Sequence, residues 1–208
     1  MKRYNCREVV ILDFETTGLS PDYARVIEVG AVVFRENKIV DSFSELMNPG
    51  RYIPYEITAL TGINSTMLKG KPAPEKVMPV LKKFIGDRVI LAHNASFDSK
   101  FLFAEMERAN LNINSPILCT LLLARRLIPN VSNYQLGTLA KHLGVKMNHA
   151  HRALDDVMAT AKIWEHLYNI VIDSTGIQDP DDHIFSTICK RPKGMVGKYC
   201  EKMRVASI

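Results

Sequence analysis

The chain of 208 residues is long enough for one domain with a good core, and it is too short for two domains of typical size. Its 47% hydrophobic and 24% charged residues exclude a largely disordered polypeptide. A net charge of +5 favours an anionic partner, although such a modest excess is also common in proteins that bind no nucleic acid.

The first predicted element is a buried strand that ends in two carboxylates. Residues from Val9 to Leu12 form a β-rich apolar run, which is typical of a strand buried on both faces. Asp13 and Glu15 follow, and residues two apart in a strand project to the same side. Because sites in α/β sheets gather at such strand ends, we interpret this pair as functional.

A hairpin is expected next. Residues 26–34 and 38–47 have the pattern of two strands, with Glu36 and Asn37 as the turn between them. Helical turns or helices are then predicted over 55–60, 65–68 and 74–84. The hairpin adds an antiparallel pair of strands beside the first one.

A second buried strand is predicted over 89–92, and polar residues follow it directly. His93 and Asn94 could bind a phosphate or a base, or could simply shape the turn. Ser96 is positioned to cap the next helix, which places Asp98 in its first turn. An acid there is also explained by the helix dipole alone, so both interpretations stay open.

A third group of polar residues precedes a long helix. After an edge strand at 117–119, helical spacing covers 120–127, 134–143 and 153–172. His151 lies in a predicted loop over 149–152, and Asp156 lies in the early turns of the last helix. Neighbouring helical residues point about 100° apart, so only one of Asp155 and Asp156 can face a shared site.

We predict a folded domain over residues 1–172 and a C-terminal tail over 173–208. The tail contains a turn-like segment at 179–182 and a loose basic cluster, made of Lys190, Arg191, Lys193, Lys198, Lys202 and Arg204. We interpret it as a solvated, partly disordered appendage in preference to a dedicated contact with nucleic acid or a partner.

The cysteines and the N-terminal residues favour a cytoplasmic location. The four cysteines lack C-x-x-C spacing and the density of a disulfide scaffold, so we expect reduced thiols. No apolar run approaches the roughly 18 residues that span a bilayer, and residues 1–7 lead into a strand instead of a signal-peptide core. We expect a cytoplasmic protein without membrane contact.

The acids come from distant parts of the chain, which predicts a metal site. Carboxylates at contact distance force protonation unless cations neutralise them. If Asp13, Glu15, Asp98 and Asp156 converge, a divalent metal is the ordinary way to keep them charged. The sequence therefore predicts one metal-dependent hydrolytic site.

Three motifs carry a family resemblance. Residues 13–19 read DFETTGL, residues 92–98 read AHNASFD, and residues 151–156 read HRALDD. In this order they resemble the DnaQ-like 3′-to-5′ exonucleases of the DEDDh type, which include proofreading subunits of bacterial replicative polymerases. In that family the histidine of the third motif precedes the last acidic ligand by five positions, which selects Asp156 over Asp155.

The resemblance implies an α/β architecture of the ribonuclease H-like fold. The fold has a central mixed five-stranded sheet, an antiparallel hairpin plus parallel strands, with helices on both faces. The resemblance also makes residues 1–172 an exonuclease domain that releases nucleoside 5′-monophosphates from 3′ ends of DNA. Single-stranded or frayed ends should be preferred, because stacking and backbone contacts do not depend on base identity.

The resemblance also implies the roles of the site residues. Two Mg²⁺ or Mn²⁺ ions about 4 Å apart would hold the scissile phosphate. Asp13 would bridge both ions, and Glu15, Asp98 and Asp156 would complete their ligands. His151 would be the general base, since a histidine with an ordinary pKa near 6.5 can take a proton from water at neutral pH.

Substrate contacts are expected from the first two motifs and from the segment 60–64, which is similar to one that lines the terminal nucleotide in this family. The expected contact residues are Thr16, Thr17, Leu19, Ile63, His93, Asn94 and Phe97.

Other functions remain open from the sequence. The same site could degrade RNA or oligoribonucleotides, because the motifs say nothing about the 2′-hydroxyl. A nucleic-acid-binding or polymerase-associated module without catalysis is a weaker alternative, since all five catalytic positions are filled. A Rossmann-like cofactor enzyme is disfavoured because no G-x-G-x-x-G follows the first strand. The sequence does not tell whether the partner is a DNA polymerase subunit or a second copy of the chain.

Overall fold

The structure is a computed structural model that describes residues 2–147 and 151–206. Its centre is a five-stranded sheet in the order β3-β2-β1-β4-β5. The strands are β1 (Glu8–Thr16), β2 (Val26–Arg35), β3 (Lys38–Leu46), β4 (Val89–Ala92) and β5 (Ile117–Cys119). β1, β2 and β3 are antiparallel neighbours, whereas β4 and β5 run parallel to β1. The mixed five-stranded sheet expected from the sequence is confirmed.

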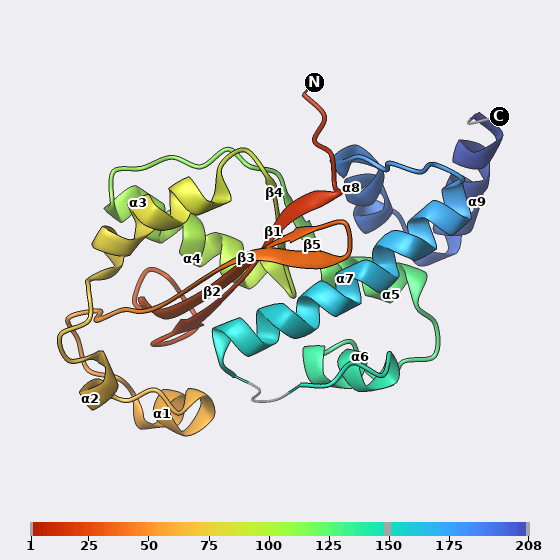
Figure 1. Cartoon of the computed structure of the whole chain (residues 1–208). Helices are drawn as coiled ribbons and strands as arrows, with labels where there is room; N and C mark the ends of the chain where they lie inside the picture. Colours follow the sequence, from red (N-terminus) through yellow and green to blue (C-terminus); the bar gives the residue numbers. More distant parts are fainter. Residues whose placement is uncertain (1, 148–150, 207–208) are drawn as a thin grey trace.

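Helices cover both faces of this sheet, as Figure 1 shows. α3 and α4 pack on one face, and α5, α7 and α8 gather on the other. The helices are α1 (Tyr55–Thr61), α2 (Ser65–Leu68), α3 (Pro74–Ile85), α4 (Ala95–Arg108), α5 (Thr120–Leu127), α6 (Leu136–His142), α7 (Ala153–Thr175), α8 (Asp182–Lys190) and α9 (Lys193–Ala206).

The central strand β1 supplies side chains to both layers, which explains its unbroken apolar run. Its odd-numbered apolar residues belong to the core around Trp164 of α7, and its even-numbered residues belong to the core around Phe101 of α4. Asp13 and Glu15 are odd-numbered, so they continue the side that faces α7.

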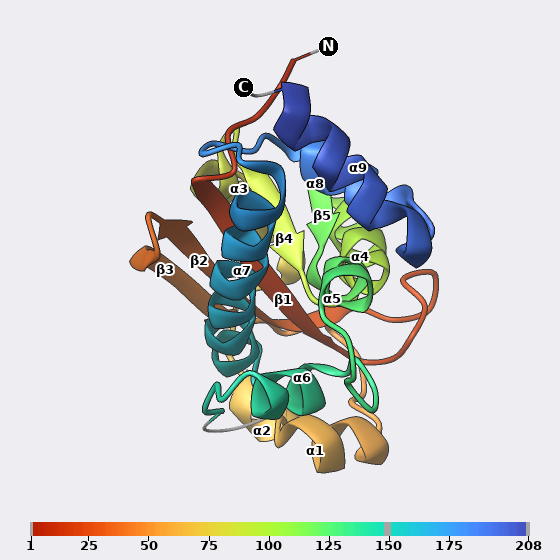
Figure 2. The ribbon, with the colours of Figure 1, turned by 90° about the vertical axis from the view of Figure 1, so that its right-hand side faces the viewer.

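The two ends of the sheet have different surroundings. Figure 2 shows both chain termini at one end, and α1, α2 and α6 at the other. β1 starts near the N-terminus and runs toward the end that carries α1, α2 and α6. The strand therefore delivers its acidic residues to the end of the molecule away from the termini.

The start of α4 differs from the sequence prediction. The helix begins at Ala95, directly after Asn94 in the left-handed conformation with φ of 65°. Ser96 lies inside the helix, where its hydroxyl donates to Asn94 Oδ1 at 3.3 Å, so it does not cap the helix as expected. The loop predicted over 149–152 begins with two residues that lie outside the described part of the chain.

The segment after residue 172 is largely helical. α7 continues to Thr175, and α8 and α9 follow it. Phe185 and Ile188 of α8 are fully buried, and the Phe185 ring lies 4.7 Å from that of Trp164. This order differs from the expected solvated tail, because apolar residues at helical spacing lie between the basic ones. The division of the chain at residue 172 stays a prediction.

Within the described ranges, no helix has both the length and the apolar character needed to cross a membrane.

Candidate active site

β1 and β2 place four positions side by side at the end of the sheet. β1 extends to Thr16, so Asp13 and Glu15 lie within the strand and not beyond it. In the antiparallel register, Asp13 is opposite Gly30, and Glu15 is opposite Glu28. Directly opposed residues share a face, so all four positions are turned toward α7.

Asp98 approaches the strand from α4, which packs on the other face. Its side chain is buried, and its Oδ1 accepts a hydrogen bond from the Phe14 N–H at 3.2 Å. This bond joins the first turn of α4 to the strand between Asp13 and Glu15. The structure thus confirms the predicted place of Asp98 in the helix and brings it beside the acids of β1.

The third motif reaches the same region from α7. His151 is exposed and has a left-handed backbone conformation with φ of 65°, and Asp156 is buried in the early part of the helix. Ligand atoms of Glu15, His151 and Asp156 all lie within 4.8 Å of one another and could hold a metal ion. Asp155 lies outside this group, so the geometry favours Asp156 as the sequence motif does.

A salt bridge that the sequence patterns did not reveal lies beside this group. Glu28 of β2 is buried, and its Oε1 accepts from Arg152 Nη2 at 2.7 Å. Its Oε2 accepts from the Ala153 N–H, the first residue of α7, at 3.1 Å. In the sequence, an acid inside the apolar run 26–34 was the available signal, and only the fold identifies its partner.

Burial raises the pKa of all four acids, and the charges of neighbouring acids raise it further for Asp13, Glu15 and Asp156. Burial, and then the charges of Asp156 and Glu28, raise the pKa of Glu15 to about 8. Burial raises the pKa of Asp98 to about 7, against hydrogen bonds from backbone amides. Burial also raises the pKa of Asp13, with the charge of Asp98 as the next cause, and it raises that of Asp156. The fold therefore holds these groups where four uncompensated charges are unfavourable.

The donor set fits a hard divalent cation. Carboxylate oxygens are the ligands that Mg²⁺ and Mn²⁺ prefer. Asp156 Oδ1 is buried and has no hydrogen-bond partner within residues 2–147 and 151–206. A buried carboxylate oxygen without a partner is costly, and a cation would satisfy it and offset the repulsion with Glu15.

The loop after β1 contains three of the predicted substrate residues. The Thr16 hydroxyl donates to the Gly18 carbonyl at 2.6 Å, and the Thr17 hydroxyl accepts from the Arg25 N–H at 3.0 Å. Both hydroxyls therefore stabilise the loop itself. Leu19 is 87% exposed, so its side chain offers an apolar surface to a ligand.

The residues after β4 have different surroundings. Burial lowers the pKa of His93, so its ring is neutral at neutral pH. Its Nε2 donates to the Tyr134 carbonyl at 2.9 Å, which leaves Nδ1 to accept from the Thr120 hydroxyl at 3.0 Å. Both ring nitrogens are thus used to join β4 to α5 and to the loop before α6. Asn94 is exposed, and Phe97 is half-buried.

Ile63 does not lie at the surface. Its side chain is fully buried and packs with Ile27, Ile53 and Leu68. The expected contact between this side chain and a terminal nucleotide is therefore not available in this structure, because Ile63 is needed for the packing of α1 and α2. Leu60, in the same segment, is 52% exposed.

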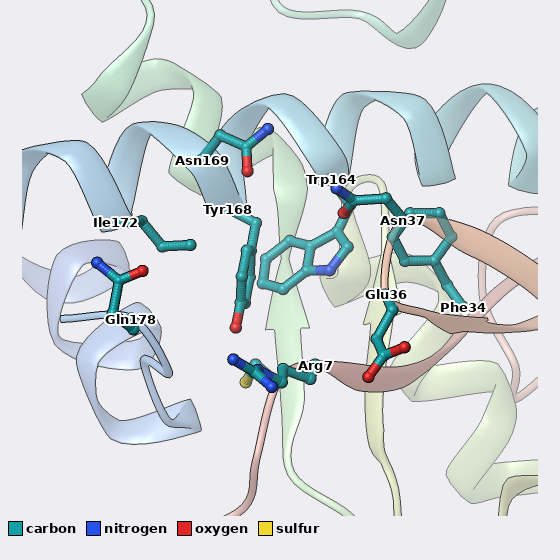
Figure 3. A pocket seen from close by; sticks show the side chains of 10 residues that line it. Arg7, Phe34, Glu36, Asn37, Trp164, Tyr168, Asn169, Ile172 and Gln178 are labelled. Carbon is teal, nitrogen blue, oxygen red and sulfur yellow. The ribbon is translucent and has the colours of Figure 1, made fainter.

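Two cavities lie near opposite ends of the sheet strands. A cavity of about 570 Å³ is lined by His93, Asn94 and Arg125, among others, and by none of the four acids. Another, of about 330 Å³, lies at the opposite end of β1, and Figure 3 shows the Tyr168 hydroxyl directed toward Arg7 there. None of the predicted site residues lines this second cavity.

Comparison with known proteins gives a consistent result. The family model described as "Exonuclease" (RNase_T) matches residues 10–164, which include all the acids and His151. The chain is 39% identical over 172 residues to the PolC-type DNA polymerase III of Clostridium perfringens. That match covers 83% of this chain and 12% of the polymerase, so the chain spans a small part of the PolC-type relatives.

Two further proteins match over most of their own length. The chain is 36% identical over 172 residues to DNA polymerase III subunit epsilon of Aquifex aeolicus, covering 82% of this chain and 85% of that subunit. The solved structure of Exonuclease X in complex with 5′ overhanging duplex DNA is similar, with a TM-score of 0.67 and 30% identity. That likeness covers 87% of this chain and 99% of the other. Together with the strand order, it gives the expected ribonuclease H-like fold.

Proposed function

Since this chain belongs to the exonuclease family, we propose that it hydrolyses the terminal phosphodiester bond at 3′ ends of DNA and releases nucleoside 5′-monophosphates. The observation that carries the proposal is the group formed by Glu15, His151 and Asp156, with Asp13 and Asp98 beside it. These residues come from three separate elements, and a shared catalytic centre accounts for their convergence better than three independent structural roles.

Mg²⁺ or Mn²⁺ is the proposed cofactor, with two ions per site. Asp13, Glu15, Asp98 and Asp156 are the proposed ligands, because the charges of the other three raise the pKa of Asp13 and because the raised pKa values of all four call for a nearby positive charge. When bound, such ions neutralise the charge of the phosphate and favour an activated water.

His151 is the proposed general base. It is exposed at the edge of the acidic group, so its ring can receive a proton from water and pass it to solvent. The carboxylate of Asp156 lies close enough to stabilise the protonated ring. His151 lies next to the proposed ligands and is exposed to solvent. This position suits a step in which a proton leaves the site.

The path of the DNA strand is proposed to follow two exposed features. Leu19 offers an apolar contact for the terminal base, which does not depend on base identity. Arg125 lines the cavity beside Asn94 and is exposed, so it can contact a phosphate further along the strand. Frayed or single-stranded ends would fit such contacts better than a closed duplex.

The function is tested with 5′-labelled oligonucleotides of matched sequence as single-stranded DNA, mismatched duplex and RNA. We expect stepwise shortening of the DNA from its 3′ end with Mg²⁺, and none with a chelator. Asp13→Asn should abolish the shortening while the protein stays folded. If RNA were shortened faster than DNA, RNA would be the preferred substrate instead. If none of the three oligonucleotides were shortened, the proposal would be contradicted.

A further inference from the structure

We propose that Glu28 and Arg152 are positioning residues, which hold the third motif over the carboxylates so that the metal ligands are in place before a metal or a strand binds. This inference rests on the proposed function, and it adds two residues that belong neither to the predicted substrate contacts nor to the predicted ligand set. Gly30 is the third component of the same arrangement.

Glu28 uses both of its carboxylate oxygens to hold the start of α7. Arg152 Nη2 donates to Oε1 at 2.7 Å, and Arg152 Nε lies 3.2 Å from each oxygen. The Ala153 N–H donates to Oε2 at 3.1 Å. Glu28 is 2% exposed, so these charge-assisted bonds form in surroundings where water competes little. Because its oxygens are already occupied, Glu28 is not available as a metal ligand.

This carboxylate performs the task of a helix cap from another element. The first turn of a helix leaves backbone N–H groups without partners, and the residue before the helix usually supplies one with its side chain. Arg152 occupies that position in α7 and provides no such bond. Glu28 of β2 accepts from the Ala153 N–H instead, and its negative charge also suits the positive end of the helix dipole.

Gly30 lets the helix lie directly on the strand. A Cβ at this position would lie 2.4 Å from the Ala153 carbonyl carbon and 2.5 Å from the Leu154 nitrogen, both backbone atoms that cannot move independently. Any side chain would therefore lift the first turn of α7 away from β2. Gly30 is opposite Asp13, so this close contact is made right beside the acids.

These contacts link the metal ligands of β1 to those of α7. Glu28 is the cross-strand partner of Glu15, and its own partner Arg152 is the residue directly after His151. The ligand atoms of Glu15, His151 and Asp156 lie within 4.8 Å of one another. A shift of Arg152 would move His151 and Asp156 away from this arrangement with Glu15. Outer contacts of this kind, when removed from metal sites, typically cost about 10- to 100-fold in metal affinity or activity.

The test compares Mn²⁺ affinity, measured by calorimetry on the full chain without substrate, with kcat and KM on a single-stranded oligonucleotide. Glu28→Gln and Arg152→Gln should each weaken Mn²⁺ binding and lower kcat by about tenfold or more, while KM changes less than about threefold. Arg152→Lys should recover part of the loss, because it restores the charge without the two-pronged geometry. Gly30→Ala should reproduce the defect although the ion pair is chemically intact.

The matched control is Glu105→Gln. Glu105 is also fully buried and accepts from an arginine, Arg25, and from a backbone amide of β2, that of Val26, but it lies on α4 away from α7. Glu105→Gln should lower the melting temperature as Glu28→Gln does, because each breaks a buried ion pair, and it should leave Mn²⁺ affinity within about twofold of that of the unaltered chain.

The outcomes separate this inference from the proposed function. Unaltered Mn²⁺ affinity and kcat in Glu28→Gln and Arg152→Gln would overturn the positioning role. Equal loss of affinity in Glu105→Gln would also overturn it, because general destabilisation would then be the cause. Absence of Mn²⁺ binding by the unaltered chain would instead refute the proposed metal-dependent function, and the positioning role with it.

Discussion

Asp98→Asn should stabilise the protein without metal at alkaline pH and remove its response to metal. Asp98 is 3% exposed, and burial raises its pKa to about 7 from an ordinary value of 3.8. Asparagine keeps an oxygen that can accept from the Phe14 N–H, but it carries no charge. The substitution therefore removes the unfavourable buried charge and retains the hydrogen bond.

The expected gain follows from the two pKa values of Asp98. They differ by about three pH units, each worth about 1.4 kcal/mol, so ionised Asp98 costs the folded state about 4 kcal/mol. A group whose pKa rises on folding stabilises the folded state below its unfolded pKa, and that contribution is lost as the pH rises through the folded pKa. The advantage of Asp98→Asn should be absent near pH 3, grow between about pH 4 and 7, and level off above.

Urea unfolding at pH 5, 6.5 and 8 measures this difference, with a chelator and with Mg²⁺. At pH 8 without metal, the variant should be more stable by up to about 4 kcal/mol, which is roughly 10 °C in melting temperature for a chain of this size. Mg²⁺ should stabilise the unaltered protein and have little effect on the variant. Asp87→Asn, at a side chain that is 96% exposed, is the control and should change neither result. Equal stability of Asp98→Asn and the unaltered chain at pH 8 without metal would refute the cost of burying the Asp98 charge.

Three further substitutions test the proposed roles. His151→Gln should lower kcat by about 10²- to 10⁴-fold and leave Mn²⁺ affinity nearly unchanged, and an unchanged rate from pH 6 to 9 would exclude a base role. Leu19→Ala should raise KM for single-stranded DNA about tenfold, since its side chain would lose contact with a base, and an equal KM would remove that contact. Arg125→Ala should reduce the slope of log binding constant against log salt concentration by about one, whereas an unchanged slope would place the strand elsewhere.

The strand and helix patterns predicted much of the sheet because local periodicity reflects burial. The apolar run of β1, ended by Asp13 and Glu15, depends on residues adjacent in the chain, and the structure keeps these acids on one face. The position of Asp98 in the first turn of α4 likewise needed only local information. Asp156 could be chosen over Asp155 from the family motif, and the geometry agrees.

Features that depend on contacts between distant elements could not be read from the sequence. Glu28 is a single acid in an apolar strand, and its structural role depends on its contact with Arg152, which lies 124 positions later. Gly30 is one of several glycines, and only the closeness of α7 makes it necessary. Ile63 was expected to contact the terminal nucleotide because of its family-like segment, but its side chain packs with Leu68 in the core.

The order of the C-terminal segment was also missed, for a different reason. Its basic residues indicate a solvated surface. The apolar positions between them, which form the other side of α8 and α9, were therefore not recognised as helical faces. Phe185 and Cys200 are buried against the rest of the protein because α7 offers them an apolar surface. Composition alone does not show such a partner.

Anomalous diffraction from crystals grown with Mn²⁺ tests most directly whether the acids form one metal centre. We expect two peaks between Asp13, Glu15, Asp98 and Asp156, with both peaks lost in crystals of Asp98→Asn. A map without a peak among these carboxylates, in protein that is otherwise folded as described, would contradict this expectation.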